Sequence, residues 1–457
     1  MPFFSRRSFL AASAVVSAAP ALAQPPGPNP QPAPKQKSPP RSDGAPDVIV
    51  VGAGAAGIAA ARRLIAAGRR VAIVEAAPEM GGRCVTDTKI FGVPYDRGAH
   101  WIHMPDINPV AKLATQTGLD IYPAPPGQRV RVGRRFARES EMEDFLALQV
   151  RATTAIADAA RKGDVACSLA LPKDLGEWRS TIEFVLGPFG CGKDLSEISA
   201  LDFSRSSERD VDAFCRQGFG TLLTKLATGL PMQLNNPVTA IEWGRRTAVE
   251  VATARGRLTA SAAIVTASTN VLAARKIKFD PELPRRQFDA LSKLTLGSYD
   301  HVTLELPGNP LGLRSDELIL EKSNGPRTAS IFANASGSTL CVVDVGGKFG
   351  RDLAAKGEKE MVAFALDWLT NLFGADMKNL VQRRHATRWN EEPWVLGAFS
   401  AAAPSGQSAR RVLMEPLNRM YFAGEAVHET LWGTVGGAWE SGERAADAVL
   451  KLFGGRR

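Results

Sequence analysis

The sequence is poor in cysteine and histidine, the residues from which disulfide frameworks and metal sites are built. Its five cysteines are scattered through 457 residues, and no two of them have CxxC spacing. That pattern excludes a disulfide-stapled scaffold and argues against a zinc site. His100 and His103 are three residues apart, but no third ligand clusters with them, so we expect no bound metal.

Blocks of like charge and long apolar runs are also missing. The net charge of +9 comes from 56 Lys and Arg against 47 Asp and Glu, dispersed along the chain without a run of five like charges. Dispersed basic residues do not make a phosphate-binding surface, so we expect no nucleic-acid partner. At roughly 150 residues per domain, the length predicts two or three globular domains.

The N-terminus has the pattern of an export signal rather than a membrane anchor. A twin-arginine motif at residues 5–10 precedes a short apolar stretch, and an A-x-A cleavage pattern ends at Ala23. The apolar stretch is shorter than the roughly 20 residues that span a bilayer. Residues 1–23 thus predict a twin-arginine signal peptide, recognition by the twin-arginine export machinery and a periplasmic or exported location. Residues 24–44 are proline-rich and predict an extended linker.

A strand, a glycine-rich turn, a helix and a second strand follow the linker. Residues 48–51 are a β-branched run typical of a buried parallel strand, and they lead directly into the sequence GAGAAG at residues 52–57. Apolar residues at helical spacing continue toward Gly68, which is expected to end the helix at its C′ position. Residues 71–74 form the second strand, and Glu75 follows it.

This βαβ unit predicts a dinucleotide-binding site. Gly52 permits the tight turn, Gly54 lets a pyrophosphate approach the backbone, and Gly57 lets the helix pack closely on the strand. Glu75 stands 18 residues after Gly57, where an acidic residue accepts hydrogen bonds from the adenosine ribose. A carboxylate at this position disfavours the 2′-phosphate of NADP.

Two further groups of residues indicate which dinucleotide binds. Gly81-Gly82-Arg83 closely follows Glu75, and YFAGE at residues 421–425 precedes GTVGGA at residues 433–438. With these segments the chain resembles the flavin-dependent amine oxidases, from about residue 47 to residue 450. The resemblance implies FAD as the cofactor and an α/β fold. In that fold a discontinuous, Rossmann-like FAD-binding domain is interleaved with an α+β substrate-binding domain.

The resemblance also implies the domain boundaries. The FAD-binding domain is expected to comprise residues 45–104, 214–285 and 390–457, and the substrate domain residues 105–213 and 286–389. Strands near residues 239–243, 248–252 and 262–266 are expected to form one small sheet that completes the FAD domain. For the substrate domain we expect strands at 299–306 and 339–345, and a helix at 359–373 with an apolar stripe facing the core.

The cofactor contacts are carried over residue by residue. Arg83 is expected to bring a cation toward a phosphate or the flavin, and Val238 to meet the adenine with its backbone. Ala398 stands where monoamine oxidases link the flavin through cysteine, so we expect FAD to be bound noncovalently. The expected FAD-binding residues are Gly52, Ala53, Gly54, Ala56, Gly57, Glu75, Ala76, Gly82, Arg83, Gly98, Ala99, His100, Trp101, Val238, Gly424, Glu425, Thr434 and Val435.

Flavin-dependent amine oxidation needs few protein groups, because the cofactor accepts the hydride at its N5 atom. The resemblance implies that Trp389 and Phe399 stand beside the flavin, although plain core packing also explains both aromatic residues. Thr434 falls on the opposite wall of the family's aromatic cage, where tyrosine is common. His301 replaces a lysine that holds a water against the flavin. We interpret it either as a catalytic residue that holds a water and carries a proton or as a structural histidine.

The sequence therefore predicts FAD-dependent oxidative deamination of a primary or secondary amine, with imine hydrolysis and reoxidation by O2 to give H2O2. A polyamine is the first expected substrate, provided that a local acidic funnel offsets the basic charge. The residues considered for that funnel or for the pocket entrance are Asp300, Glu391, Glu392, His428, Glu429 and Glu440. The alternatives are an amine dehydrogenase with another electron acceptor, an L-amino-acid oxidase, a flavin desaturase and, least favoured, a non-enzymatic flavin-binding protein.

Overall fold

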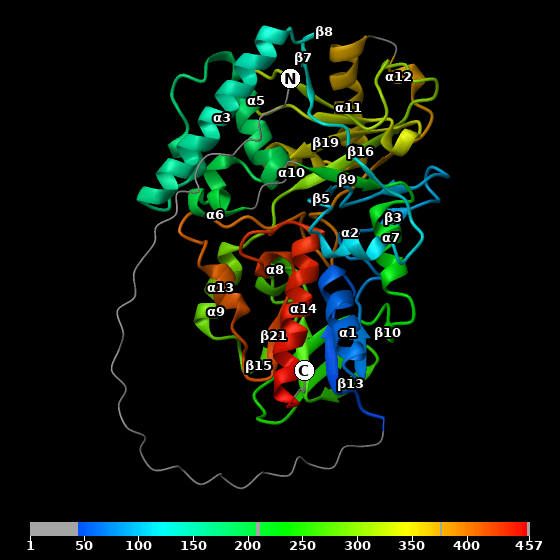
Figure 1. The fold of residues 1–457 in the computed structure, drawn as a ribbon, viewed down its shortest axis with the longest axis vertical. Helices are drawn as coiled ribbons and strands as arrows, with labels where there is room; N and C mark the ends of the chain where they lie inside the picture. The colour runs from blue at the N-terminus through cyan, green and yellow to red at the C-terminus, as the bar shows by residue number, and fades with distance from the viewer. Residues whose placement is uncertain (1–43, 207–210, 375–376, 455–457) are drawn as a thin grey trace.

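A computed structural model describes residues 44–206, 211–374 and 377–454. The predicted signal peptide and nearly all of the predicted linker lie outside the described residues. One half of the molecule is built on a five-stranded parallel sheet in the order β10-β2-β1-β14-β21 (Figure 1). Its strands are β1 (Val48–Val51), β2 (Val71–Val74), β10 (Met232–Gln233), β14 (Ala262–Val265) and β21 (Met420–Phe422). Because these strands come from all three segments assigned to the FAD-binding domain, the sheet itself is discontinuous in sequence.

Two helices lie side by side against this sheet, α1 (Ala55–Ala66) and α14 (Val435–Leu452) (Figure 1). They touch closely at Gly442, where a Cβ would clash with the Ala56 carbonyl. Helix α1 ends as predicted: Gly68 has a φ of +74°, and the N–H of Arg69 bonds back to the Leu64 carbonyl at 3.0 Å. The predicted βαβ unit is thus confirmed from its first strand to its second.

A small four-stranded sheet, in the order β13-β12-β11-β15, completes this half. It consists of β11 (Val238–Glu242), β12 (Val249–Thr253), β13 (Gly256–Ala260) and β15 (Lys278–Asp280). The expectation that residues 262–266 belong to it was wrong, because β14 pairs in parallel with β1. The run Ala262–Val265 is buried throughout, as a central parallel strand must be, whereas β13 is mostly exposed and fits the edge that it occupies.

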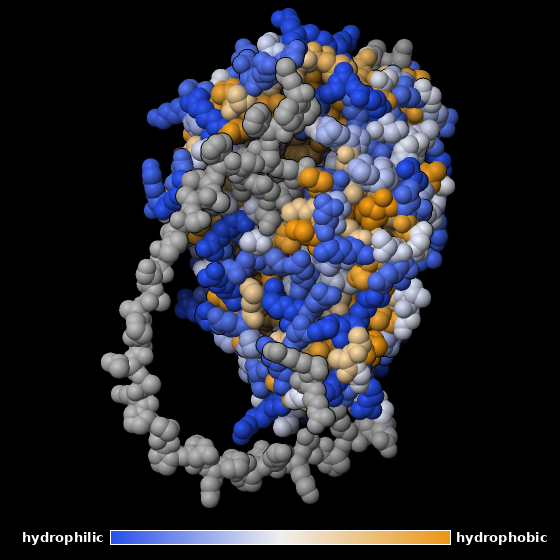
Figure 2. All heavy atoms as spheres, viewed as in Figure 1, coloured by the Kyte–Doolittle hydropathy of each residue, from blue (hydrophilic) through white to orange (hydrophobic). Residues whose placement is uncertain are grey.

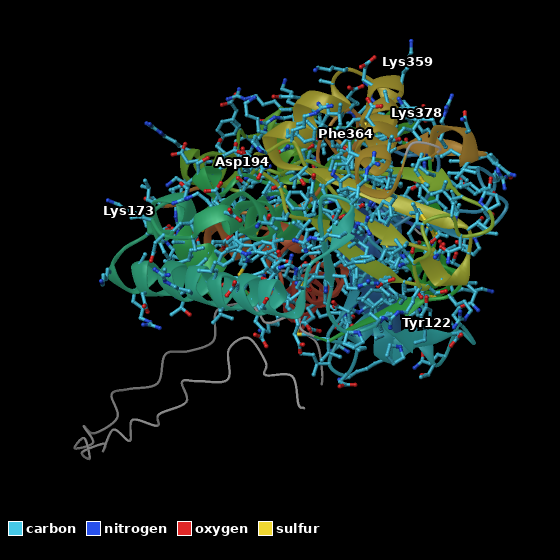
Figure 3. All side chains as sticks on the ribbon, turned by 90° about the horizontal axis from the view of Figure 1, so that it is seen from above. Tyr122, Lys173, Asp194, Lys359, Phe364 and Lys378 are labelled. Carbon is cyan, nitrogen blue, oxygen red and sulfur yellow. The ribbon has the colours of Figure 1, made fainter. Side chains whose placement is uncertain are left out.

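The other half is built on a seven-stranded sheet, ordered β20-β16-β19-β18-β17-β7-β8. The strands are β7 (Arg129–Val132), β8 (Arg135–Phe136), β16 (Tyr299–Glu305), β17 (Glu317–Glu321), β18 (Ser330–Ala333), β19 (Leu340–Gly346) and β20 (Arg384–Ala386). Helix α11 (Glu358–Phe373) packs with these strands in one hydrophobic core and buries the predicted apolar stripe. Figure 3 shows Lys359 pointing outward from this helix, whereas Phe364 is turned toward the interior.

Short sheets join the two halves. They are β3 (Thr86–Asp87) with β4 (Tyr95–Asp96), and β5 (Ile102–His103) with β9 (Asp212–Cys215) and β6 (Ile121–Pro123). The predicted boundary between residues 213 and 214 falls inside β9, so a strand, and not a linker, crosses it. The other domain boundaries stay predictions.

The remaining helices are mostly short. They are α2 (Pro109–Ala114), α3 (Glu139–Lys162), α4 (Cys167–Ala170), α5 (Arg179–Phe184), α6 (Ala200–Arg205), α7 (Phe219–Leu226), α8 (Thr269–Ala273), α9 (Arg285–Lys293), α10 (Gly347–Ala354), α12 (Met377–Leu380) and α13 (Ala409–Met414). Single turns are η1 (Gly176–Trp178), η2 (Val185–Phe189), η3 (Leu195–Glu197), η4 (Ala335–Gly337) and η5 (Glu425–Val427). Over the described ranges, no helix combines the length and apolarity needed to cross a membrane.

Candidate active site

A cavity of about 2130 Å³ is lined by residues from both halves of the molecule. This volume exceeds the roughly 300–1,000 Å³ of an ordinary small-molecule pocket, so a dinucleotide and a second molecule fit together. Figure 2 shows hydrophilic and hydrophobic residues intermixed over the face in view. The cavity is therefore the feature that separates a specific site from an ordinary globular surface.

The glycine-rich turn forms one end of the cavity. Gly52 has a φ of +105°, which suits glycine, and a Cβ on Gly57 would clash with the Gly52 carbonyl. Gly54 lines the cavity, and a Cβ there would meet the protein only at ordinary contact distances, the nearest being 3.8 Å from the Gly81 carbonyl oxygen. No side chain caps the N-terminus of α1 at Gly54. The structure thus opens a helix N-terminus to the cavity, where an anionic group is stabilised.

Glu75 stands at the end of β2 and holds this turn. Its carboxylate accepts the N–H of Ala53 at 2.6 Å and the N–H of Ala77 at 2.8 Å. Burial raises the pKa of Glu75, and the two backbone N–H groups partly oppose that shift. The predicted ribose contact stays a prediction, because Glu75 lines the cavity with these two protein donors already in place. Ala76 and Val238 also line this end.

Arg83 and Glu425 form a partly buried ion pair, and both residues line the cavity. Nη1 of Arg83 donates to Glu425 at 2.8 Å and to the carbonyl of Ala398 at 2.6 Å. Burial alone would raise the pKa of Glu425, but Arg83 and the hydroxyl of Ser400 outweigh it and lower that pKa. Arg83 therefore reaches across the cavity wall to Glu425, and its predicted contact with a phosphate or a flavin stays a prediction.

The segment around residues 97–101 forms another part of the wall. A Cβ on Gly98 would clash with the Arg83 carbonyl, and Ala99 donates its N–H to that same carbonyl at 2.9 Å. Nδ1 of His100 lies 2.8 Å from the Asp96 carboxylate. The buried Nε2 of the same ring has no hydrogen-bond partner among the residues described. Trp101 lines the cavity beside it. These four predicted cofactor residues are thus brought together on one wall.

His301 stands on β16 with both ring nitrogens facing acceptors. Nδ1 lies 2.6 Å from the Asp344 carboxylate, and Nε2 lies 3.0 Å from the Gly98 carbonyl oxygen. Two acceptors require two N–H donors, so the ring is an imidazolium. Burial alone would lower the pKa of His301, but Asp344 outweighs it and the pKa is raised. The predicted water-holding role therefore does not fit this arrangement unless one nitrogen is released.

Aromatic rings surround the same end of the cavity. The ring centroid of Tyr299 lies 6.2 Å from that of Phe189 and 5.8 Å from that of Phe399. Trp389 also lines the cavity and donates its ring N–H to the carbonyl of Arg97 at 3.0 Å. Thr434 caps α14: its hydroxyl donates to Leu431 at 2.7 Å and accepts from Gly437 at 2.9 Å. Trp389, Phe399 and Thr434 thus all line the cavity, and their roles beside a flavin stay predictions.

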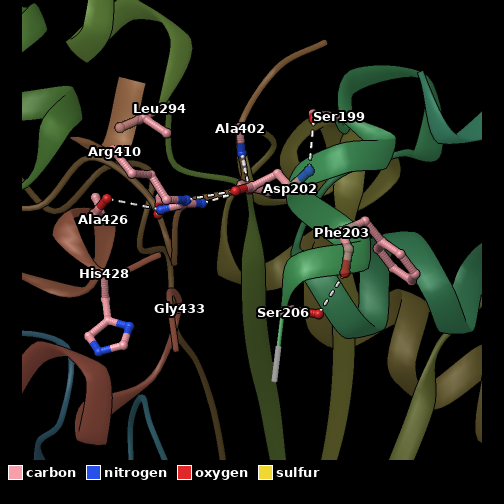
Figure 4. A network of polar contacts seen from close by, with 12 residues as sticks. Ser199, Asp202, Phe203, Ser206, Leu294, Ala402, Arg410, Ala426, His428 and Gly433 are labelled. Atoms are coloured by element: carbon pink, nitrogen blue, oxygen red, sulfur yellow. Dashed lines mark hydrogen bonds and ion pairs between the residues drawn. The ribbon is translucent and has the colours of Figure 1, made fainter. Parts of the chain in front are cut away.

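A buried polar network supports this end from behind (Figure 4). Arg410 donates through Nε and Nη2 to the two oxygens of Asp202 at 2.8 and 2.7 Å, and neither side chain is exposed. The same guanidinium reaches Ser400 at 3.2 Å, and Ser400 donates to Glu425 at 2.7 Å. Asp202 of α6 is thereby connected through Arg410 to the Glu425 carboxylate that Arg83 holds.

The sequence profile of the family described as "Flavin containing amine oxidoreductase" matches residues 55–161 and 171–450. The chain belongs to the flavin-containing amine oxidoreductases. It is 28% identical to Polyamine oxidase 4 of Oryza sativa subsp. japonica over 444 residues, covering 89% of each chain. It is 26% identical to Lysine-specific histone demethylase 1B of Mus musculus, covering 88% of this chain and 52% of that one.

Solved structures share the fold. Cyclohexylamine oxidase from Brevibacterium oxydans superposes with a TM-score of 0.75 at 22% identity, over 90% of this chain and 100% of that chain. Wild-type putrescine oxidase bound to putrescine does so with a TM-score of 0.75 at 22% identity, over 89% and 99%. At these identities the likeness establishes the α/β architecture alone. The chain is an FAD-dependent amine oxidase by family.

The cavity fits the flavin that this family carries. The glycine-rich turn at residues 52–57, which we call the glycine cradle, and the uncapped N-terminus of α1 suit a diphosphate. Gly424, Glu425 and Val435 also line the cavity. The cavity continues from there to the aromatic end, which leaves room for a substrate beside a flavin ring. The remaining predicted cofactor residues, Ala56 and Gly82, line the cavity as well.

Of the six residues considered for an acidic funnel or for the pocket entrance, Glu391 and Glu392 line the cavity and the other four do not. Asp300 is buried behind the wall, where it accepts the N–H of Trp389 at 2.8 Å. His428 bonds to Glu440 at 3.1 Å, and Glu429 pairs with Arg411 at 2.6 Å; none of these three residues lines the cavity. Glu391 and Glu392 do line it, but Glu391 is paired with Arg388. Helix and loop packing, invisible in the sequence, turns most of these acids away.

Tyr299, Asp344 and Phe189 belong to the site and were missed by sequence reasoning. Tyr299 and His301 are two residues apart on β16 and therefore lie on the same face of the strand. This spacing could have indicated Tyr299 from the sequence. Asp344 is paired with His301 across strands β16 and β19, and that register is not readable from the sequence. Phe189 stands in η2, a π-helical turn without a strong sequence pattern.

Proposed function

We propose that this protein oxidises a primary or secondary amine with noncovalently bound FAD and passes the electrons to O2, giving H2O2. The observation that carries the proposal is one continuous cavity that joins the glycine cradle to the aromatic end. Bound flavin would accept one hydride, which is a proton with two electrons, from the amine, and water would then hydrolyse the imine. Noncovalent binding is supported by Ala398, whose methyl group offers no nucleophile at the cavity wall.

The residues of this chain have defined tasks in that reaction. Gly54 and the N-terminus of α1 would hold the diphosphate, and Glu75 the ribose. Phe399, Tyr299 and Trp389 would exclude water and orient the amine. His301 would keep a positive charge at the wall, which disfavours a protonated substrate and favours the neutral amine that can lose hydride.

The test is anaerobic reduction of the purified holoprotein by a panel of amines, followed by admission of air. Loss of the oxidised-flavin absorbance with an amine, and peroxide on reoxidation, is the expected result. If an amine bleaches the flavin but air neither restores the absorbance nor gives peroxide, the protein is instead a dehydrogenase with another electron acceptor. If no amine bleaches the flavin, amine oxidation is the wrong function. Flavin that stays attached after denaturation would exclude noncovalent binding.

A polyamine is a second candidate substrate, since the curated relatives include proteins named polyamine oxidases. An L-amino acid is less favoured, because its carboxylate needs a buried arginine on the substrate side. Of the two arginines lining that side, Arg129 is committed to Glu317 at 2.9 Å and Arg314 is exposed.

We also propose export through the twin-arginine route, on the strength of residues 5–23. The expected result is recovery of the processed protein in the periplasmic or extracellular fraction. Replacing Arg6 and Arg7 by lysine should retain the unprocessed precursor inside the cell. Unchanged export of that double variant would exclude the twin-arginine route.

A further inference from the structure

The substrate side of the cavity presents apolar surface where a bound molecule would lie. Its inner wall is formed by six residues that share large apolar surfaces: Leu186, Phe189, Phe203, Tyr299, Phe399 and Trp432. Leu146 and Val150 of α3 continue this surface outward and are 39% and 45% exposed. An apolar lining of this kind binds a substrate by packing and by release of water, without a charged partner.

The polar atoms near this wall are already used within the protein. The Tyr299 hydroxyl is turned away and donates to Asp344 at 3.0 Å. The Thr434 hydroxyl is bonded to Leu431 and Gly437 in the cap of α14. Both nitrogens of His301 face Asp344 and Gly98. None of these three groups is left to recognise a second polar group on a substrate.

Two carboxylates at the mouth of the cavity are already paired. They belong to Asp212 and Glu317, and Asp212 lies 2.6 Å from Nδ1 of His103. Glu317 accepts Arg129 on one oxygen at 2.9 Å and the N–H of Arg314 on the other at 2.8 Å. Each carboxylate thus has a partner, and the positive charges of Arg129 and Arg314 stand at the same mouth.

We infer that the preferred substrate is an amine with one nitrogen on a bulky apolar group, a cycloalkyl or arylalkyl monoamine, rather than a diamine or polyamine. A second ammonium group against this apolar wall would be desolvated, while the described carboxylates at the mouth, Asp212 and Glu317, are already paired. An uncompensated buried charge is expensive. A ring or aryl group would instead fill the apolar wall between Phe189 and Phe399. The inference rests on the proposed amine oxidation and narrows its substrate class.

The first experiment compares kcat/KM of the holoenzyme for cyclohexylamine and benzylamine with that for putrescine and spermidine. At least a tenfold preference for the two monoamines is expected. If putrescine or spermidine is preferred while flavin reduction proceeds, the substrate class is wrong and amine oxidation stands. If none of the four amines bleaches the flavin anaerobically, the proposed function itself fails.

The second experiment tests the charge argument directly. Arg129→Gln releases one oxygen of Glu317, so the ratio of kcat/KM for putrescine over cyclohexylamine should rise by about tenfold. Arg314→Gln is the matched control: it removes the same charge from the same mouth, but Arg314 holds Glu317 through its backbone N–H, which the substitution keeps. An equal change of the ratio in both variants, or no change in Arg129→Gln, would overturn the argument from carboxylate pairing.

Discussion

Nδ1 of His301 lies 2.6 Å from the Asp344 carboxylate, and both side chains are nearly buried. The other oxygen of Asp344 accepts the Tyr299 hydroxyl at 3.0 Å, so one carboxylate fixes two residues of the cavity wall. Nε2 of His301 meets the Gly98 carbonyl, which belongs to the segment expected to contact the flavin. The position where the family resemblance implies a lysine thus holds a histidine whose direction is set by Asp344 on strand β19.

Replacing Asp344 by asparagine should lower the pKa of His301, because the largest interaction that raises it is removed. The folded-state pKa of His301 is raised, so the stability it contributes is present at low pH and is lost as the pH rises through that pKa. Asp344→Asn should remove this pH-dependent part and destabilise the fold by about 3–5 kcal/mol, as breaking a buried pair does. The measurements are the NMR titration of the His301 ring and urea unfolding.

The control for this variant is Asp352→Asn, which removes the same charge from an exposed pair with Lys348. Exposed pairs contribute about 0–1 kcal/mol to the free energy of unfolding. The His301 titration should not change in the control. A His301 pKa that is equal in the wild type and Asp344→Asn would contradict the imidazolium assignment.

Asp300 should make the protein less stable as the pH rises from about 4 to 6. Burial raises its pKa to about 6, while Trp389 and Thr387 oppose that shift through hydrogen bonds. The folded state therefore binds the Asp300 proton more tightly than the unfolded chain does, and this contribution is lost as the pH rises through 6. A shift of this size corresponds to about 3 kcal/mol.

The Asp300→Asn variant isolates this contribution, since its amide oxygen can still accept the N–H of Trp389. The stability of the wild type minus that of the variant should decrease between pH 4 and pH 6 and then stay level. Urea unfolding of both proteins across this range is the measurement. A difference that is independent of pH would show that Asp300 does not titrate near 6.

Local signals explain what the sequence could predict. The glycines of residues 52–57, the β-branched strand before them and Gly68 act within a few residues of their positions, so the βαβ unit followed from sequence. Phe399 and Thr434 came from the family resemblance, and both line the cavity in the structure. Asp344 could not be predicted, because its meeting with His301 depends on the register between two strands. The direction of each acidic side chain likewise depends on packing, which explains why Asp300, Glu429 and Glu440 do not line the cavity.

The buried pair of Asp202 and Arg410 should stabilise the protein and hold the wall behind Glu425 (Figure 4). Asp202→Ala leaves Arg410 as an uncompensated buried cation, and a loss of about 3–5 kcal/mol is expected. Because Arg410 also contacts Ser400, which bonds to Glu425, flavin should dissociate faster from this variant. Thermal unfolding and the rate of flavin release into dilute buffer are the measurements.

Arg411→Ala provides the comparison, since Arg411 follows directly in sequence but pairs with Glu429 at the surface. Its unfolding free energy should change by less than about 1 kcal/mol, and flavin release should be unchanged. Equal flavin retention in Asp202→Ala and the wild type would show that the pair serves stability alone.

Gly54 and Gly57 should separate cofactor binding from folding. Gly54 has an ordinary extended backbone with φ of −80°, and a Cβ there meets the protein at no less than 3.8 Å. Gly54→Val should therefore fold with an unfolding free energy within about 1 kcal/mol of the wild-type apoprotein. Its side chain would occupy the place of the diphosphate, so FAD affinity should fall at least a hundredfold.

Gly57→Ala is expected to have the opposite effect, because it should reduce the stability of the fold itself. Its Cβ would clash with the Gly52 carbonyl, so α1 must move away from β1 and the apoprotein itself should be destabilised by about 2–4 kcal/mol. Urea unfolding of the apoproteins and fluorescence titration with FAD measure the two effects separately. If Gly54→Val binds FAD as tightly as the wild type, the diphosphate does not lie against Gly54, and the placement of the cofactor at the N-terminus of α1 is wrong.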